Sequence, residues 1–248
     1  MNPASAASEG SASSSASHAI PTVFVVDDDT TVRESLDSMI RCAGWQPETF
    51  GSAREFLAHP RVVAPSCLVL DVTLPDLNGL ELQARVATDR IGMPVIFVTG
   101  CGDVRMTVRA MKAGAVDFLT KPCADELLLS AIRQAIERSR AALAHESEME
   151  AIRDAYASLS GRERQVMALV ISGRLNKQVG AELGISEITV KAHRGSLMRK
   201  MKARSLPDLV NMAARLGLAS PRRGSHPVDR SLGAGGFRPS HAADTIVQ

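Results

Sequence analysis

The chain has 248 residues, of which 45% are hydrophobic, and this excludes both a single very small domain and a wholly disordered protein. Residues 20–122 carry 10 basic and 13 acidic side chains, a net charge of −3, whereas residues 158–217 carry 11 and 4, a net charge of +7. We therefore expect the two halves to bind different kinds of partner.

Targeting and redox signals are weak. The first 19 residues are rich in Ser and Ala but lack the basic start and apolar run of a signal peptide. No segment reaches transmembrane length, so no membrane partner is expected. The cysteines form no CxxC pair and have no accompanying histidines, which argues against a zinc site or a disulfide framework and favours the cytoplasm. They are Cys42, Cys67, Cys101 and Cys123.

Residues 1–19 and about 218–248 have low complexity and are predicted to be flexible tails. Residues 20–123 alternate apolar runs with helical stretches. Helices are expected from about Thr30, over SAREFLA, from about Gly79 and from Val104. The expected strands are TVFVV, ETF, CLVL, PVIFV and VDFL. This order predicts an α/β domain with a parallel sheet covered on both faces.

An all-α region is predicted next. From Ala124 the helical pattern continues for about 35 residues without Pro or Gly, which predicts a closing and linker helix over 124–157. Part of it is expected to join the domains or to pair with a second copy. Residues 158–217 then show four helix signals, at about 161–172, 176–183, 187–202 and 207–216, with Gly173 and Gly184 as stops.

Acidic side chains follow the predicted strands. Asp27 and Asp28 follow the first strand and Asp71 the third, so they should meet at the carboxyl edge of the sheet. Three carboxylates repel one another unless a hard cation such as Mg²⁺ neutralises them. Thr99 and Lys121 add a hydroxyl and an ammonium to the same edge. Each motif alone also fits a solvated turn, but together they predict a site for a phosphoryl group on a carboxylate.

The stretch from about residue 22 to 123 resembles a receiver domain, in its motifs VVDDD, LVLDVTLPDLNG, FVTG, AMKAGAVDF and TKP. The resemblance implies a flavodoxin-like (CheY-like) doubly wound, five-stranded fold. It also implies that Asp71 accepts a phosphoryl group from a phosphohistidine on a sensor histidine kinase. The implied Mg²⁺ ligands are Asp27, Asp28, Asp71 and the backbone carbonyl of Thr73.

The same resemblance assigns roles around the phosphoryl group. Lys121 is expected to pair with the oxygens of the phosphoryl group, and Thr99 to hydrogen-bond to them. Phe118 is expected to act as a switch by moving inward together with Thr99. Phe118 fits an ordinary core position almost equally well. Cys101 stands where the closest subgroup often has His, and Cys123 where Phe is commoner. Because of these two departures, the resemblance does not define the details of the interdomain or dimer surface.

The segment NKQVGAELGISEITVKAHRGSLMRKM predicts a helix-turn-helix whose second helix opens at Glu187. The two helices are expected to pack through Ala181, Gly184, Ile185 and Val190. The outward positions of the second helix are expected to carry basic side chains able to neutralise DNA phosphates. These are Lys191, Arg194, Arg199 and Lys200. A solvated basic face is the alternative interpretation.

The segment from Leu159 to about Gly217 is similar to the LuxR-type DNA-binding domain, through LSGRERQVMALVISG and the helix-turn-helix segment. Its combination with a receiver resembles the FixJ/NarL class, closest to the FixJ branch. The implied DNA contacts are Lys191 and Ala192 at the bases, and Lys177, Thr189 and Arg194 at the backbone. Gly195 occupies a place that often has a longer side chain in the NarL branch, which leaves base readout there open.

Together these resemblances imply a response regulator and not an enzyme. Phosphorylation would promote a homodimer that binds double-stranded promoter DNA, with RNA polymerase as a further partner and activation as the common outcome in this branch. A dehalogenase-type enzyme also uses an Asp nucleophile and Mg²⁺, but it needs a second Asp where this chain has Thr73. Further alternatives are a receiver whose C-terminal helices only dimerise, and a ligand-sensing quorum regulator, which would lack the Asp site.

Overall fold

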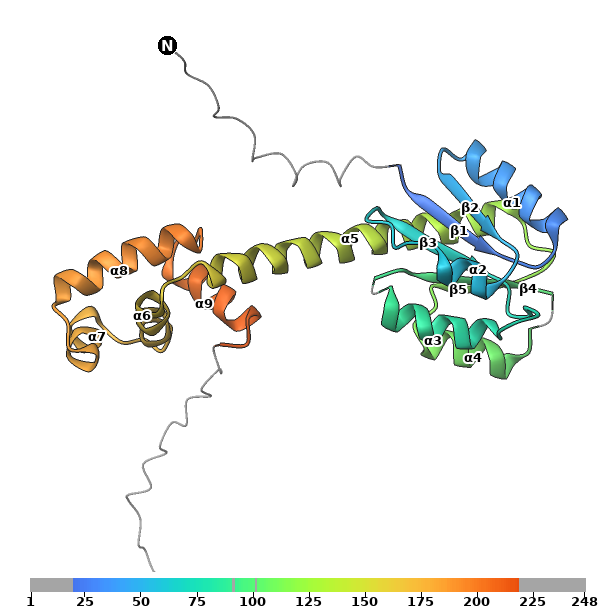
Figure 1. The fold of residues 1–248 in the computed structure, drawn as a ribbon. Helices are drawn as coiled ribbons and strands as arrows, with labels where there is room; N and C mark the ends of the chain where they lie inside the picture. The colour runs from blue at the N-terminus through green and yellow to red at the C-terminus, as the bar shows by residue number, and fades with distance from the viewer. Residues whose placement is uncertain (1–19, 91, 101, 219–248) are drawn as a thin grey trace, which may run out of the picture. The chain divides into compact units, whose positions relative to one another are not determined.

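The computed structural model describes residues 20–90, 92–100 and 102–218. The two low-complexity segments that were predicted to be tails, apart from Leu218, and Cys101 lie outside these ranges. The chain divides into two compact units, Met1–Ser158 and Leu159–Gln248 (Figure 1).

The first unit is built on a parallel five-stranded sheet in the order β2-β1-β3-β4-β5. Its strands are β1 (Thr22–Val26), β2 (Gln46–Phe50), β3 (Ser66–Leu70), β4 (Val95–Thr99) and β5 (Asp117–Thr120). In β1, Val26 is in register with Phe50 of β2 and with Leu70 of β3. The residues that follow β1 and β3 therefore leave the sheet side by side.

Helices cover both faces of this sheet, as the alternating sequence pattern predicts (Figure 1). They are α1 (Thr30–Cys42), α2 (Ala53–Ala58), α3 (Gly79–Asp89), α4 (Val104–Lys112) and α5 (Asp125–Ala157). One core joins Phe24 and Phe97 of the sheet to Phe56 and Leu82, from α2 and α3. A second core on the other face contains residues of α1 and α5. It includes Val25, Ile40, Ile96, Leu128 and Ile132.

The long helix α5 is anchored to the sheet by its first half. Its buried positions cluster between Leu128 and Ser139. The backbone NH of Ser66, at the start of β3, donates a buried hydrogen bond to the Ser139 hydroxyl at 3.1 Å. Within the described ranges of the chain, no helix combines the length and the apolar character that crossing a membrane requires.

Between residues 159 and 218, the second unit forms four helices around a small apolar core. They are α6 (Gly161–Ile171), α7 (Asn176–Leu183), α8 (Glu187–Lys200) and α9 (Leu206–Arg215). Helix α8 packs against both α6 and α7. The core is formed by Val166, Met167, Val170, Val179, Val190, Leu197, Met201, Leu209 and Ala213.

Several predicted boundaries shift by a few residues for local reasons. Helix α8 ends at Lys200 because Lys202 adopts a positive φ of 54°, which a right-handed helix cannot contain. Helix α9 begins directly after Ser205, whose side chain accepts a hydrogen bond from the Asp208 NH. Strand β2 extends the predicted ETF by two residues, since all five of its positions pair with β1.

Candidate functional site

Three carboxylates meet at the carboxyl edge of the sheet, as the sequence predicts. Asp27 and Asp71 are 2% and 8% exposed, whereas Asp28 is exposed. One oxygen from each of the three lies within 4.8 Å of the others. Hard oxygen donors at this spacing fit a divalent cation such as Mg²⁺.

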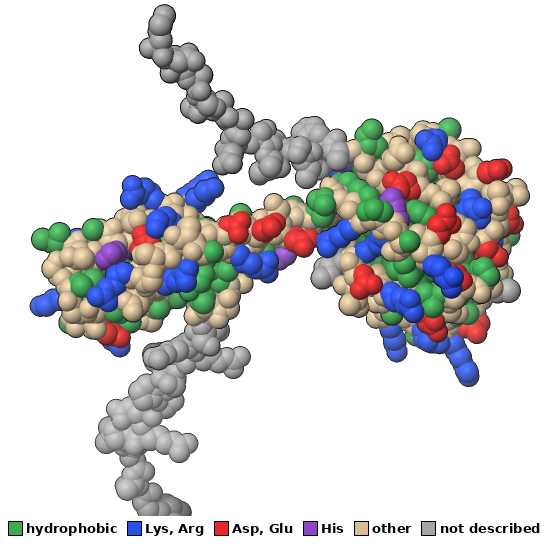
Figure 2. Space-filling view, in the orientation of Figure 1, with side chains coloured by type: hydrophobic (Ala, Val, Ile, Leu, Met, Phe, Trp, Pro, Cys, Tyr) green, Lys and Arg blue, Asp and Glu red, His purple; other side chains and the backbone are tan. Residues whose placement is uncertain are grey.

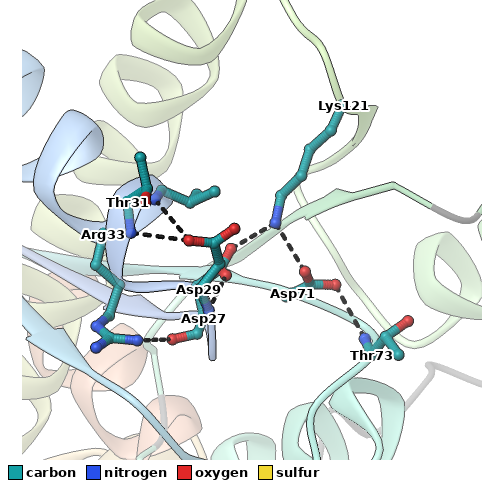
Figure 3. Close-up of polar contacts among 8 residues, drawn as sticks. Asp27, Asp29, Thr31, Arg33, Asp71, Thr73 and Lys121 are labelled. Carbon is teal, nitrogen blue, oxygen red and sulfur yellow. Dashed lines mark hydrogen bonds and ion pairs between the residues drawn. The ribbon is translucent and has the colours of Figure 1, made fainter.

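The Lys121 ammonium lies between two of these carboxylates (Figure 3). Its Nζ is 2.5 Å from Asp27 Oδ2 and 2.7 Å from Asp71 Oδ2. Partial burial lowers the pKa of Lys121, but hydrogen bonds and charge attraction from Asp27 and Asp71 outweigh this effect and raise it. Lys121 is therefore charged at neutral pH, yet one ammonium leaves the three carboxylates with excess negative charge. That excess is what a divalent cation would neutralise.

Backbone contacts hold Asp71 in place. Its Oδ1 accepts a hydrogen bond from the Thr73 NH at 2.9 Å (Figure 3). The first residue of α3, Gly79, lies close to the Asp71 backbone. A Cβ at this position would stand only 2.5 Å from the Asp71 carbonyl oxygen. Position 79 therefore requires glycine for a close approach of two backbones. Sequence reasoning placed a helix start at Gly79 but did not find this contact.

Two further residues at this edge were not singled out from the sequence. The Arg33 guanidinium donates to the Asp27 carbonyl oxygen at 2.7 Å, which ties α1 to the end of β1 (Figure 3). Asp29 caps α1 by accepting from the Thr31 NH at 2.8 Å. An Asp directly before a helix is a known N-cap signal, so Asp29 was within reach of sequence reasoning, whereas Arg33 was not.

The expected switch residues lie close to the site. Thr99 is fully buried at the end of β4, and its carbonyl accepts from the Lys121 NH at 2.8 Å. Phe118 is half-buried, with its ring centroid 5.8 Å from that of Phe97. A Cβ at Gly102 would stand only 2.7 Å from the Phe118 ring. Phe118 therefore has core contacts and also adjoins the loop before α4, so both interpretations of this residue stay open.

Cys123, two residues after Lys121, gives no support to redox chemistry. Burial raises the pKa of the half-buried Cys123 thiol, which disfavours the reactive thiolate.

The second unit carries many basic side chains, and Figure 2 shows Lys and Arg gathered over it. On α8, Lys191, Ala192 and Arg199 are exposed, as are Thr189 in the first turn and Lys177 on α7. Lys191 Nζ also lies 3.2 Å from Glu187 Oε1, an exposed pair that contributes little to stability.

Two of the predicted outward cations also contact neighbouring helices. Lys200 is exposed, as expected for an outward position, and its Nζ contacts the Glu163 carboxylate of α6 at 2.8 Å. Arg194 is half-buried and donates to the Asn176 side chain at the start of α7, at 2.7 Å. Both side chains join helices of the domain, which limits their freedom to reach a phosphate.

The predicted packing of the turn is partly wrong. Ala181 is exposed and Gly184 caps α7 in a left-handed conformation with φ of 65°, while Val190 is buried as expected. The close contact is made by Gly180, where a Cβ would stand 2.7 Å from the Ile185 carbonyl oxygen. Ile185 is half-buried, so the error concerns Ala181, whose expected packing role belongs to Gly180.

Glu163 is a buried carboxylate that the sequence analysis did not single out. It is 4% exposed and forms a capping box with Ser160, with reciprocal hydrogen bonds at 2.7 and 3.2 Å. Hydrogen bonds from the Lys200 ammonium, the Ser196 hydroxyl and the Ser160 NH lower the pKa of Glu163 to about 2. The motif SGRE is a capping-box signal, whereas the contact with Lys200 has no local signal.

Two family models match this chain, one in each unit. The response regulator receiver domain matches residues 23–133, and the luxR family of bacterial regulatory proteins matches residues 157–213. The chain belongs to the two-component response regulators. It combines a receiver with a LuxR-type DNA-binding domain, consistent with the FixJ/NarL class, and it is not an enzyme. The dehalogenase alternative is thereby excluded.

The matches to similar proteins span most of the length of each relative. Nodulation protein W of Bradyrhizobium diazoefficiens is 50% identical over 80% of this chain and 87% of its own. The transcriptional regulatory protein FixJ of Rhizobium meliloti is 45% identical over 77% of this chain and 94% of its own. The solved structure of the response regulator StyR matches with a TM-score of 0.72 and 46% identity, over 79% of this chain and all of StyR.

Proposed function

We propose that a sensor histidine kinase phosphorylates this response regulator on Asp71, and that the phosphorylated protein binds promoter DNA in the cytoplasm to activate transcription by RNA polymerase. The observation that supports Asp71 best is its contact with Lys121 beside two further carboxylates. A nucleophilic carboxylate, a fixed cation and a set of metal-binding oxygens are the groups that phosphoryl transfer requires.

In the proposed reaction, an Asp71 carboxylate oxygen attacks the phosphorus of a phosphohistidine. The P–O bond forms as the P–N bond breaks, and the imidazole nitrogen leaves with the electron pair. Asp71 needs no separate base because it attacks as the carboxylate. Lys121 would neutralise charge on the phosphoryl oxygens, and the Thr99 hydroxyl would donate a hydrogen bond to one of them. When bound by Asp27, Asp28, Asp71 and the Thr73 carbonyl, Mg²⁺ would supply further charge neutralisation.

The surface of α4 supports dimerisation as the output of phosphorylation. Val104 is 80% exposed, and Val108 and Met111 are each 44% exposed. This helix follows the loop that adjoins Phe118. A change at Asp71 would act on it through Thr99 and Phe118, because a local charge acts at a distance by biasing a two-state element. Two copies joined by two-fold symmetry would then present two copies of α8 about one DNA turn apart.

Sedimentation of the full-length protein tests this coupling. We expect the molecular mass to change from monomer to dimer on treatment with acetyl phosphate and Mg²⁺, and the affinity for specific DNA to rise in parallel. The substitution Val104→Glu should prevent the dimer without preventing phosphorylation, because it places a charge on the apolar face. A rise in DNA affinity at constant mass would contradict dimerisation and favour release of a masked DNA-binding domain.

Two substitutions on α8 test the division between base and phosphate contacts. Lys191→Ala should weaken binding to a selected operator by about 1–3 kcal/mol more than binding to random DNA, as expected for a base contact. Arg199→Ala should weaken both duplexes alike and reduce the dependence of affinity on salt. Titrations at several salt concentrations measure both quantities, and equal losses for Lys191→Ala would assign Lys191 to a phosphate.

A further inference from the structure

Helix α8 presents an apolar side chain to solvent in its first turn. Ile188 is 80% exposed, whereas Val190 and Leu197 on the same helix are fully buried in the core. Because two residues rotate an α-helix by about 200°, Ile188 lies opposite Val190. Its side chain therefore contributes little to the packing of the domain.

Ile188 begins a row of exposed positions that we call the outward stripe. The stripe consists of Ile188, Lys191, Ala192, Gly195 and Arg199, all exposed and spaced i, i+3, i+4, i+7 and i+11 on one helix face. A Cβ at Gly195 would meet no atom within 4 Å, so the stripe is open at its centre. Its middle is small and apolar, and its two long side chains are cationic.

We infer that Ile188 contacts the C5 methyl group of a thymine in the major groove, as a specificity contact. The inference rests on the proposed DNA binding. In the major groove the base edges offer hydrogen-bonding atoms, and the thymine methyl is the apolar group among them. An aliphatic side chain placed against polar base atoms would remove water from them without replacing its hydrogen bonds. Thymine is the base that avoids this cost.

The rest of the stripe fits a duplex as the occupant. Lys191 supplies a cation for a base edge and Arg199 one for a phosphate, and the unit around them carries a net charge of +7 over residues 158–217. Ala192 and Gly195 leave room for the helix backbone to approach the bases. An exposed aliphatic residue is common on protein surfaces, but this one lies on the face of the domain whose charge matches DNA.

The test uses phosphorylated full-length protein and removes one methyl group at a time from the DNA. A duplex is first selected from a random library with the unsubstituted protein, and each thymine is then replaced by deoxyuridine. We expect one thymine per half-site at which deoxyuridine weakens binding about threefold to tenfold. Ile188→Ala should weaken binding to the thymine duplex by a similar factor and should no longer distinguish deoxyuridine there.

Two further variants act as controls. Ile188→Val retains a branched aliphatic side chain and should keep most of the discrimination. Val63→Ala alters an equally exposed aliphatic residue, 76% exposed in the first unit, and should change nothing. If no thymine is sensitive, or if Ile188→Ala still discriminates, the contact is overturned while DNA binding stands. If the protein selects no duplex at all, the proposed function fails and the inference with it.

Discussion

Asp71→Asn is expected to abolish Mg²⁺-dependent phosphorylation of the full-length protein by acetyl phosphate. Asparagine keeps the shape of the side chain and the hydrogen bond from the Thr73 NH, but its amide is not a nucleophile. It also removes one of the two carboxylates that contact Lys121. Intact-mass spectrometry before and after treatment with the donor measures the loss directly.

The matched control for this variant is Asp29→Asn. Asp29 lies beside the acidic cluster and caps α1, and asparagine is an equally good cap. This substitution removes one negative charge near the site while leaving Asp27, Asp28 and Asp71 intact, so phosphorylation should continue. If the Asp71→Asn variant were still phosphorylated, another residue would be the phosphoryl acceptor.

Glu163→Ala should destabilise the second unit by about 2 kcal/mol, from the loss of the cap and of buried hydrogen bonds. The carboxylate joins the start of α6 to Lys200 at the end of α8, so its loss would affect two helices together. Hydrogen exchange of α6 and α8 in the full-length protein, followed by mass spectrometry, measures this change. Glu182→Ala removes an exposed acid from α7 and should have almost no effect.

The same carboxylate predicts how stability depends on pH. The folded state lowers the pKa of Glu163 from 4.5 to about 2, so the unfolded state binds a proton first as the pH falls. Its contribution is complete above about pH 4.5, declines below that value and is lost at about pH 2. Glu163→Gln should remove this component of the pH dependence. An unchanged acid profile of α6 and α8 in that variant would contradict the assignment.

The sequence was sufficient for the features that repeat along the chain. Alternating strands and helices predicted the doubly wound sheet, and the order of the strand ends brought Asp27, Asp71 and Lys121 to one edge. These predictions succeed because a parallel sheet places all its carboxyl ends together, whatever the details of its loops. The helix-turn-helix could also be predicted, because its helix caps and its glycine turn are local sequence signals.

Contacts between distant residues were not accessible in this way. Lys200 and Glu163 are 37 positions apart, and a basic helix position gives no sign of whether its exposed side chain also contacts another helix. The packing role expected for Ala181 belongs to Gly180, which contacts the Ile185 carbonyl, and two adjacent small residues give no local signal of which one makes this contact. Gly79 and Arg33 likewise act through backbone atoms, which side-chain patterns do not describe.

The two faces of α8 have separate tasks, and this affects how the domain can diverge. Val190 and Leu197 hold the helix in the core, while the side chains of the outward stripe are exposed. Substitutions on the stripe can therefore accumulate at little cost in folding free energy. A duplicated gene with this scaffold could acquire a new set of target promoters by changing a few side chains on one helix. Its receiver could still be phosphorylated by the same kinase.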